Sequence, residues 1–190
     1  MEKEIIVALS ILILWQCILG MFMRNIMKKY IKIVKQYNYS EGENLSPEWK
    51  EKTAHLLKRA KILCVITFGS SSSKKLYNTL CYMLATTEFM DGNTDEFLRI
   101  TNTAKRSFSN TYAMLSSVLA LYYNAEGDRE MAEKYYRSYL LCDHEKKNMQ
   151  IVMQKLFSDT KVDETKLKKV LQEVWDPATM KLFQENKLIN

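Results

Sequence analysis

The chain has 190 residues, of which 47% are apolar and 26% are charged, and its formal net charge at pH 7 is +6. Residues 1–40 hold six basic and two acidic side chains, a net charge of +4, so the rest of the chain carries only +2. This concentration of charge argues against a broad nucleic-acid surface, and we expect no nucleic-acid partner. The four cysteines and two histidines show no metal-ligand spacing, so no metal or other cofactor is expected.

The chain begins with a long uncharged segment. Nineteen residues, from Ile5 to Met23, carry no formal charge, and as a helix they reach roughly 28 Å, close to the ~30 Å hydrocarbon core of a bilayer. A signal peptide would have a positive start, a shorter apolar run and a small-residue cleavage site, which this segment lacks. The segment therefore predicts an uncleaved transmembrane anchor, in preference to a cleaved signal or a buried soluble helix.

Basic residues follow the predicted span, whereas only Lys3 precedes it. Such residues are retained on the cytoplasmic side, so the pattern predicts an outer N-terminus and a cytoplasmic C-terminal domain. The helix around them either lies near anionic headgroups or serves only as a stem. We therefore divide the chain into an anchor region, 1–40, and one domain, 41–190. The flanking basic residues are Arg24, Lys28, Lys29, Lys32 and Lys35.

The remainder of the chain is predicted to be helical, because it contains only two prolines and five glycines and no lasting alternation of polar and apolar residues. Ser46-Pro47 and Asp176-Pro177 are typical helix starts, and Ser72 or Ser73 is expected to cap another. The connections are short, which favours antiparallel helical hairpins. The expected helices are 5–38, 47–67, 74–90, 94–107, 111–125, 129–142, 146–158, 163–175 and 177–187.

A comparison of the chain with itself indicates a repeat. The sixteen residues from Tyr82 align without gaps on those from Ser117, an offset of 35, and the matches include Leu84 with Leu119 and Gly92 with Gly127. The segment LSSVLALYYNAEGDREMAEKYYRSYL, 115–140, resembles the tetratricopeptide repeat family: a leucine and a small residue in the first helix, a Gly-Asp turn, and a small residue and an aromatic in the second. The resemblance covers roughly residues 74–142 and implies a solenoid of antiparallel hairpins. The expected fold is therefore all-α, with the N-terminal transmembrane helix followed by this solenoid.

Repeats of this family typically bind a peptide in a groove lined by their first helices. The resemblance therefore implies a groove, whose alternative is that flanking helices pack over the same side chains. The groove positions lack the lysine and asparagine set that clamps a C-terminal carboxylate in some family members, so a chaperone-tail receptor is not expected. The implied groove residues are Thr79, Tyr82, Thr86, Phe89, Met114, Ser117, Leu121 and Asn124.

No pattern of catalytic residues is visible in the sequence. The stretch FGSSSSKK, 68–75, has neither the glycine spacing nor the preceding strand of a phosphate loop, and we expect no enzyme activity. The main hypothesis is a membrane-anchored scaffold or adaptor that binds a protein or peptide at the cytoplasmic face. Its alternatives are a structural subunit of a membrane complex and, if the topology is inverted, an extracytoplasmic chaperone-like repeat protein.

Overall fold

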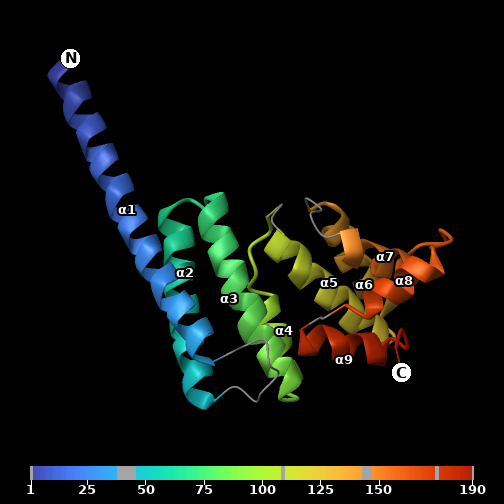
Figure 1. Cartoon of the computed structure of the whole chain (residues 1–190). Helices are drawn as coiled ribbons and strands as arrows, with labels where there is room; N and C mark the ends of the chain where they lie inside the picture. Colours follow the sequence, from blue (N-terminus) through green and yellow to red (C-terminus); the bar gives the residue numbers. More distant parts are fainter. Residues whose placement is uncertain (1, 38–45, 108–109, 143–146, 174–175, 190) are drawn as a thin grey trace.

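The computed structural model describes every residue except 1, 38–45, 108–109, 143–146, 174–175 and 190 (Figure 1). All regular elements within the described residues are α-helices, which confirms the predicted all-α class. They are α1 (Glu2–Tyr37), α2 (Pro47–Ile66), α3 (Ser71–Met90), α4 (Thr94–Thr101), α5 (Asn110–Ala125), α6 (Arg129–Leu140), α7 (Lys147–Phe157), α8 (Glu164–Leu171) and α9 (Pro177–Glu185).

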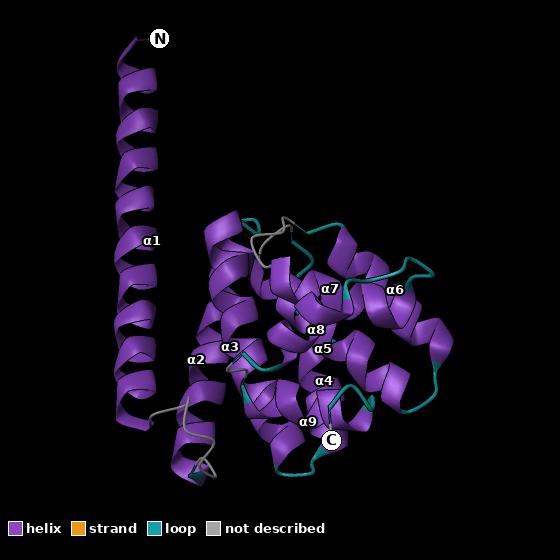
Figure 2. Ribbon diagram, turned by 45° about the vertical axis from the view of Figure 1, so that its right-hand side comes forward, coloured by secondary structure: helices purple, strands orange, loops and turns teal. Residues whose placement is uncertain are grey.

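Helix α1 has two halves with different surroundings. Its N-terminal half projects beyond the other helices (Figures 1 and 2), and from Ile5 to Ile18 its large apolar side chains are exposed. The hydroxyl of Ser10 donates a hydrogen bond to the Ile6 carbonyl at 2.9 Å, so this polar group is satisfied within the helix. The stretch from Ile5 to Ile33 is long and apolar enough to cross a membrane. The C-terminal half packs on the domain.

The second half of α1 lies antiparallel to α2 (Figure 1). Ile26 and Ile33 are buried in this contact, and Leu19 is the first residue of α1 that packs against the core. A pair of isoleucines seven residues apart faces one side of a helix, and each buried side chain contributes ~2 kcal/mol. We call residues 19–33 the stem. The stem is part of the domain core, although the sequence analysis assigned it to the anchor region.

Helix α2 begins where its sequence predicts. The hydroxyl of Ser46 accepts a hydrogen bond from the Trp49 amide at 3.3 Å, and Pro47 occupies the first turn. A cation then joins α2 to the end of α3: the Lys50 ammonium lies 3.0 Å from a Glu88 carboxylate oxygen and also pairs with Asp91. These two contacts hold the first turn of α2 against the α3–α4 turn.

The hairpins α3–α4 and α5–α6 end their first helices in the same way, at the predicted offset of 35 residues. Gly92 and Gly127 both have a positive φ, +80° and +79°. The Asn93 amide donates to the Glu88 carbonyl at 2.8 Å, and the equivalent Asp128 amide donates to Tyr123 at 2.9 Å. Glycine adopts this left-handed conformation without the steric cost of a Cβ atom. The internal match in the sequence thus corresponds to two hairpins with equivalent turns.

Three predicted boundaries differ from the structure. Helix α3 is capped by Ser70, whose hydroxyl accepts from the Ser73 amide at 3.4 Å, so the predicted capping role of Ser72 or Ser73 is wrong. Helix α4 ends at Thr101 rather than near 107, because the buried Asn78 side chain bonds the amide and carbonyl of Lys105, each at 2.8 Å, and holds that segment outside the helix. Helix α8 ends at Leu171, and the predicted end at 175 lies outside the described residues.

Candidate functional site

The predicted groove residues lie together on α3 and α5, but most of them are covered. Thr79, Met114 and Asn124 are half-buried, and the other five are buried. Members of both sets contact the same element, since Tyr82, Phe89, Leu121 and Asn124 all contact α9 or one of its caps, so the structure brings the two sets to one face. That face is not open to solvent. The five buried members are Tyr82, Thr86, Phe89, Ser117 and Leu121.

Helix α9 is the element that covers this face (Figures 1 and 2). It begins as predicted, since Asp176 accepts from the Thr179 amide at 3.1 Å and Pro177 follows in the first turn. Leu182 and Phe183 of α9 are fully buried. Helix α9 therefore occupies the space that the resemblance assigned to a peptide. This arrangement corresponds to the alternative in which flanking helices pack over the same side chains.

Polar contacts hold α9 against both first helices. The Tyr82 hydroxyl donates to an Asp176 carboxylate oxygen at 2.8 Å on the α3 side. On the α5 side, the Asn186 side-chain amide donates to the Leu121 carbonyl at 3.0 Å and accepts from Asn124 at 2.7 Å. Net contributions of ~1 kcal/mol per hydrogen bond add to the burial of two large apolar side chains. Displacement of α9 by a peptide would break all of these contacts.

The predicted flanking basic residues follow the apolar half of α1. Arg24, Lys28, Lys29 and Lys32 are exposed. Lys35 belongs to α1, but its side chain lies outside the described ones. Because these residues share the helix with the stem, they lie on the same side of the predicted span as the domain.

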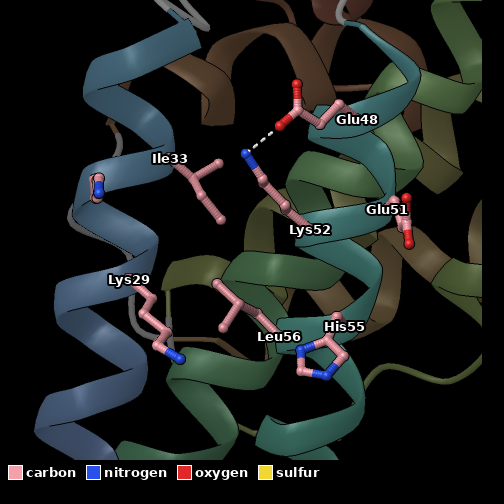
Figure 3. A pocket seen from close by; sticks show the side chains of 8 residues that line it. Lys29, Ile33, Glu48, Glu51, Lys52, His55 and Leu56 are labelled. Carbon is pink, nitrogen blue, oxygen red and sulfur yellow. Dashed lines mark hydrogen bonds and ion pairs between the residues drawn. The ribbon is translucent and has the colours of Figure 1, made fainter.

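An open pocket lies between the stem and α2 (Figure 3). Its volume is about 530 Å³, within the range of small-molecule or side-chain pockets. Ile33 and Leu56 form its apolar base, and charged side chains surround it, with Lys52 paired to Glu48 at 2.5 Å. We call this the stem pocket. Its charged and polar lining residues are Lys29, Lys32, Glu48, Glu51, Lys52 and His55.

The stem pocket suits binding by an apolar group with an acidic neighbour. Three lysines stand against two glutamates, and Glu48 already pairs with Lys52, so Lys29 and Lys32 are the cations nearest the pocket that face solvent. The exposed Lys52–Glu48 pair contributes little to stability. Lys29 and Lys32 are available to an anionic group of a ligand. In the sequence the two lysines are recognisable as topology signals. The pocket is not recognisable there, because the residues from α2 become lining residues only through antiparallel packing on the stem.

Titratable groups in the domain interior are perturbed by burial. Burial raises the pKa of Tyr77 to about 12 and of Cys81 to about 11, although both also hydrogen-bond Thr103. Burial lowers the pKa of Lys50, but its bonds to Asp91 and Glu88 outweigh this effect and leave the pKa raised. The Lys50 ammonium is thus kept charged by two carboxylates. These groups stabilise the fold and do not face the stem pocket.

Metal-ligating side chains do not gather in the part of the chain that the structure describes: it brings together no three of His, Cys, Asp and Glu. Cys142 is buried at the end of α6, whereas Asp143 and His144 lie outside the described residues.

Comparison with known proteins gave no match to a family model, a curated protein or a solved structure.

Proposed function

We propose that the protein is a single-pass membrane protein that displays an all-α interaction domain at the cytoplasmic face and recruits another protein there. The observation that carries this proposal is the division of α1. One unbroken helix exposes apolar side chains over its first half and buries Ile26 and Ile33 in the domain core over its second. Such a helix couples a membrane anchor directly to a folded domain.

The exposed half of α1 supports the membrane assignment. Ten of the fourteen residues from Ile5 to Ile18 present large apolar side chains without any cover from the described domain, and water would solvate such a surface poorly. A bilayer removes that cost, and the helix satisfies its own backbone groups. The exposed basic residues from Arg24 to Lys32 favour a cytoplasmic domain.

The hairpins support a tetratricopeptide-like repeat as the finer description of the domain. Their equivalent glycine turns stand 35 residues apart, and Ala85 and Ala120 are both fully buried at matching positions. Since α9 covers the first-helix face, we place the partner's binding site at the stem pocket instead. Its apolar base and exposed lysines suit a segment that carries an apolar side chain beside an acidic one.

Protease protection of a C-terminally tagged chain tests the topology. In intact cells the tag should survive, and it should be digested once the membrane is opened. Digestion in intact cells would contradict the cytoplasmic assignment and favour the extracytoplasmic alternative. Loss of the chain from the membrane fraction on carbonate extraction would contradict the anchor itself.

Site-specific photocrosslinking tests the partner site. A photoreactive residue in place of His55, in the stem pocket, should crosslink a discrete protein in native membranes. The matched control is Glu130, an exposed residue at the start of α6. Lys52→Glu should suppress the crosslink at 55 by reversing the local charge. Equal crosslinking at both positions, or none at either, would contradict a partner site in the pocket.

The covered first-helix face favours a second candidate, a structural subunit of a membrane complex that takes no separate cargo. In that case the stem pocket would be filled by a permanent neighbour. Crosslinks from position 55 would then persist after detergent extraction and copurify in fixed proportion with the chain, whereas a recruited partner would dissociate on dilution.

A further inference from the structure

The turn between α2 and α3 lies at the end of the domain that faces the apolar half of α1 (Figures 1 and 2). In the stem pocket Lys29 of α1 and Leu56 of the antiparallel α2 lie side by side (Figure 3). Phe68 follows Leu56 by about twelve residues. Because α1 runs antiparallel to α2, the same number of residues at equal helical rise leads back from Lys29 to about residue 17 of α1. Packing of α1 on the core begins nearby, at Leu19. The turn is therefore level with the uncharged segment 5–23.

An exposed apolar surface occupies this level. Ile62, Val65 and Phe68 recur at three-residue intervals, and 54%, 71% and 98% of their surfaces are exposed. We call these three residues the apolar tip. Four lysines flank it in the sequence: Lys58 and Lys61 of α2 are exposed. Lys74 and Lys75 in the first turns of α3 add two further positive charges. An exposed apolar tip flanked by lysines is the pattern of a surface that lies in a lipid headgroup region.

The backbone of Phe68 shows that its exposure is built into the turn. The Phe68 amide donates to the Val65 carbonyl at 3.1 Å, and the Gly69 amide donates to Cys64 at 2.7 Å. Gly92 and Gly127 occupy the same place in the α3–α4 and α5–α6 turns, with the same pair of hydrogen bonds. Phe68 adopts the left-handed φ of +49° despite its Cβ atom. A phenylalanine in a position that favours glycine weakens the fold, and its ring makes almost no contact within the domain.

We propose that the apolar tip inserts into the interfacial layer of the leaflet from which the domain emerges, as a second membrane contact beside α1. This inference rests on the proposed membrane anchor. The Phe68 ring takes the place that interfacial aromatics occupy, and the lysines reach back toward anionic headgroups. Two contacts define the rotation of the domain about α1, so the stem pocket faces a set direction along the membrane surface.

Depth-dependent quenching tests this proposal in the full chain. With Cys17→Ala, an environment-sensitive fluorophore is attached at Val65→Cys, Ile13→Cys or Asp95→Cys, in vesicles of phosphatidylcholine and phosphatidylglycerol with a spin-labelled lipid. Asp95 is exposed near the opposite end of α3 and reports on water. Probes at 65 and 13 should be quenched about threefold more than the probe at 95, because an interfacial apolar face lies below the headgroups.

The three probes separate the two proposals. Quenching at 13 but not at 65 would overturn the second contact while leaving the anchor intact, and would leave the tip for a protein partner, since the vesicles contain none. Absence of quenching at both 13 and 65 would overturn the anchor and the second contact together.

A variant of Phe68 tests whether its ring holds the tip in the membrane. With the fluorophore at Val65→Cys, Phe68→Gly should lower quenching about twofold, while Tm stays the same or rises because glycine accepts the positive φ. Met90→Ala is the matched control: it shortens a 40% exposed apolar side chain at the other end of α3 and should change neither value. Unchanged quenching in Phe68→Gly would overturn the role of the ring.

Discussion

The two halves of α1 differ in apolar content and in surroundings: 12 of the 14 residues from Ile5 to Ile18 are apolar, against 9 of the 15 in the stem. From Ile5 to Ile18 the apolar side chains point outward on every face, whereas in the stem Ile26 and Ile33 point inward and Ile31 remains 45% exposed. The stem interleaves its apolar residues with lysines, and the first half does not. An apolar surface on all sides is suited to lipid, and a one-sided surface is suited to a protein core. The pattern along one helix thus indicates where a surface suited to lipid gives way to one suited to a protein core.

The largest expected effect concerns the first half of α1, whose surface is suited to lipid. Leu9→Arg combined with Leu12→Arg should raise the cost of membrane insertion by about 6 kcal/mol, because each arginine at the centre of a span costs ~3 kcal/mol. Carbonate extraction should release this double variant from membranes. The control pair, Met27→Arg with Ile31→Arg, lies beyond the span on exposed positions of the stem and should stay in the membrane fraction. Retention of the Leu9 and Leu12 variant would contradict a lipid surrounding.

Truncation addresses both halves at once. A chain of residues 19–190 should fold as the domain does, because residues 5–18 are exposed. A chain of residues 38–190 should lose about 5 kcal/mol of unfolding free energy, since removal of Ile26 and Ile33 uncovers α2. Urea titrations followed by circular dichroism compare the two chains. Equal stability would show that the stem is not part of the core.

A single substitution measures how much the packing of the stem on the domain contributes to stability. Ile26→Ala in the 19–190 chain should lower the unfolding free energy by about 3 kcal/mol, because it leaves a cavity at a 1% exposed position. Ile31→Ala, on the exposed side of the same helix, should change it by less than about 0.5 kcal/mol. Similar losses for both variants in urea titrations would contradict the one-sided stem.

The smallest effect concerns pH and should belong to the domain alone. Burial raises the pKa of Tyr77 to about 12 and of Cys81 to about 11, from ordinary values of 10.0 and 9.0. The folded state therefore keeps protons that the unfolded state loses, so this stability is complete below about pH 9 and falls as the pH rises toward about 12.

Urea titrations of the 19–190 chain at about pH 8 and about pH 11 should show this loss. Tyr77→Phe removes the 3.0 Å bond to Thr103 and should cost about 1 kcal/mol at the lower pH, with a weaker pH dependence. An unchanged pH dependence in Tyr77→Phe would contradict the contribution of this hydroxyl.

Local signals made part of this structure predictable. The uncharged run of α1, the caps at Ser46 and Asp176 and the 35-residue offset between Gly92 and Gly127 depend on residues near one another in the chain, and the structure confirms each of them. The early end of α4 was not predictable in this way, because Asn78 acts on Lys105 from 27 residues away.

The candidate sites depended on contacts that no local pattern encodes. The groove residues do share a face, but the covering by α9 follows from contacts such as Tyr82 with Asp176, which are 94 residues apart. The stem pocket needs α1 and α2 to meet with Lys29 beside Leu56. The exposed lysines were found from the sequence as charges, and their role as pocket residues appears only after packing.

The unbroken course of α1 from Glu2 to Tyr37 joins the domain rigidly to the proposed membrane segment. Spans respond to a change in hydrocarbon thickness by tilting, with typical tilts of ~20°. Since the stem carries the domain without a hinge, a tilt of this size would swing a surface ~30 Å away through roughly 10 Å. The thickness of the host membrane, and not only a binding partner, would then set how far the surfaces remote from the apolar tip stand from the lipid.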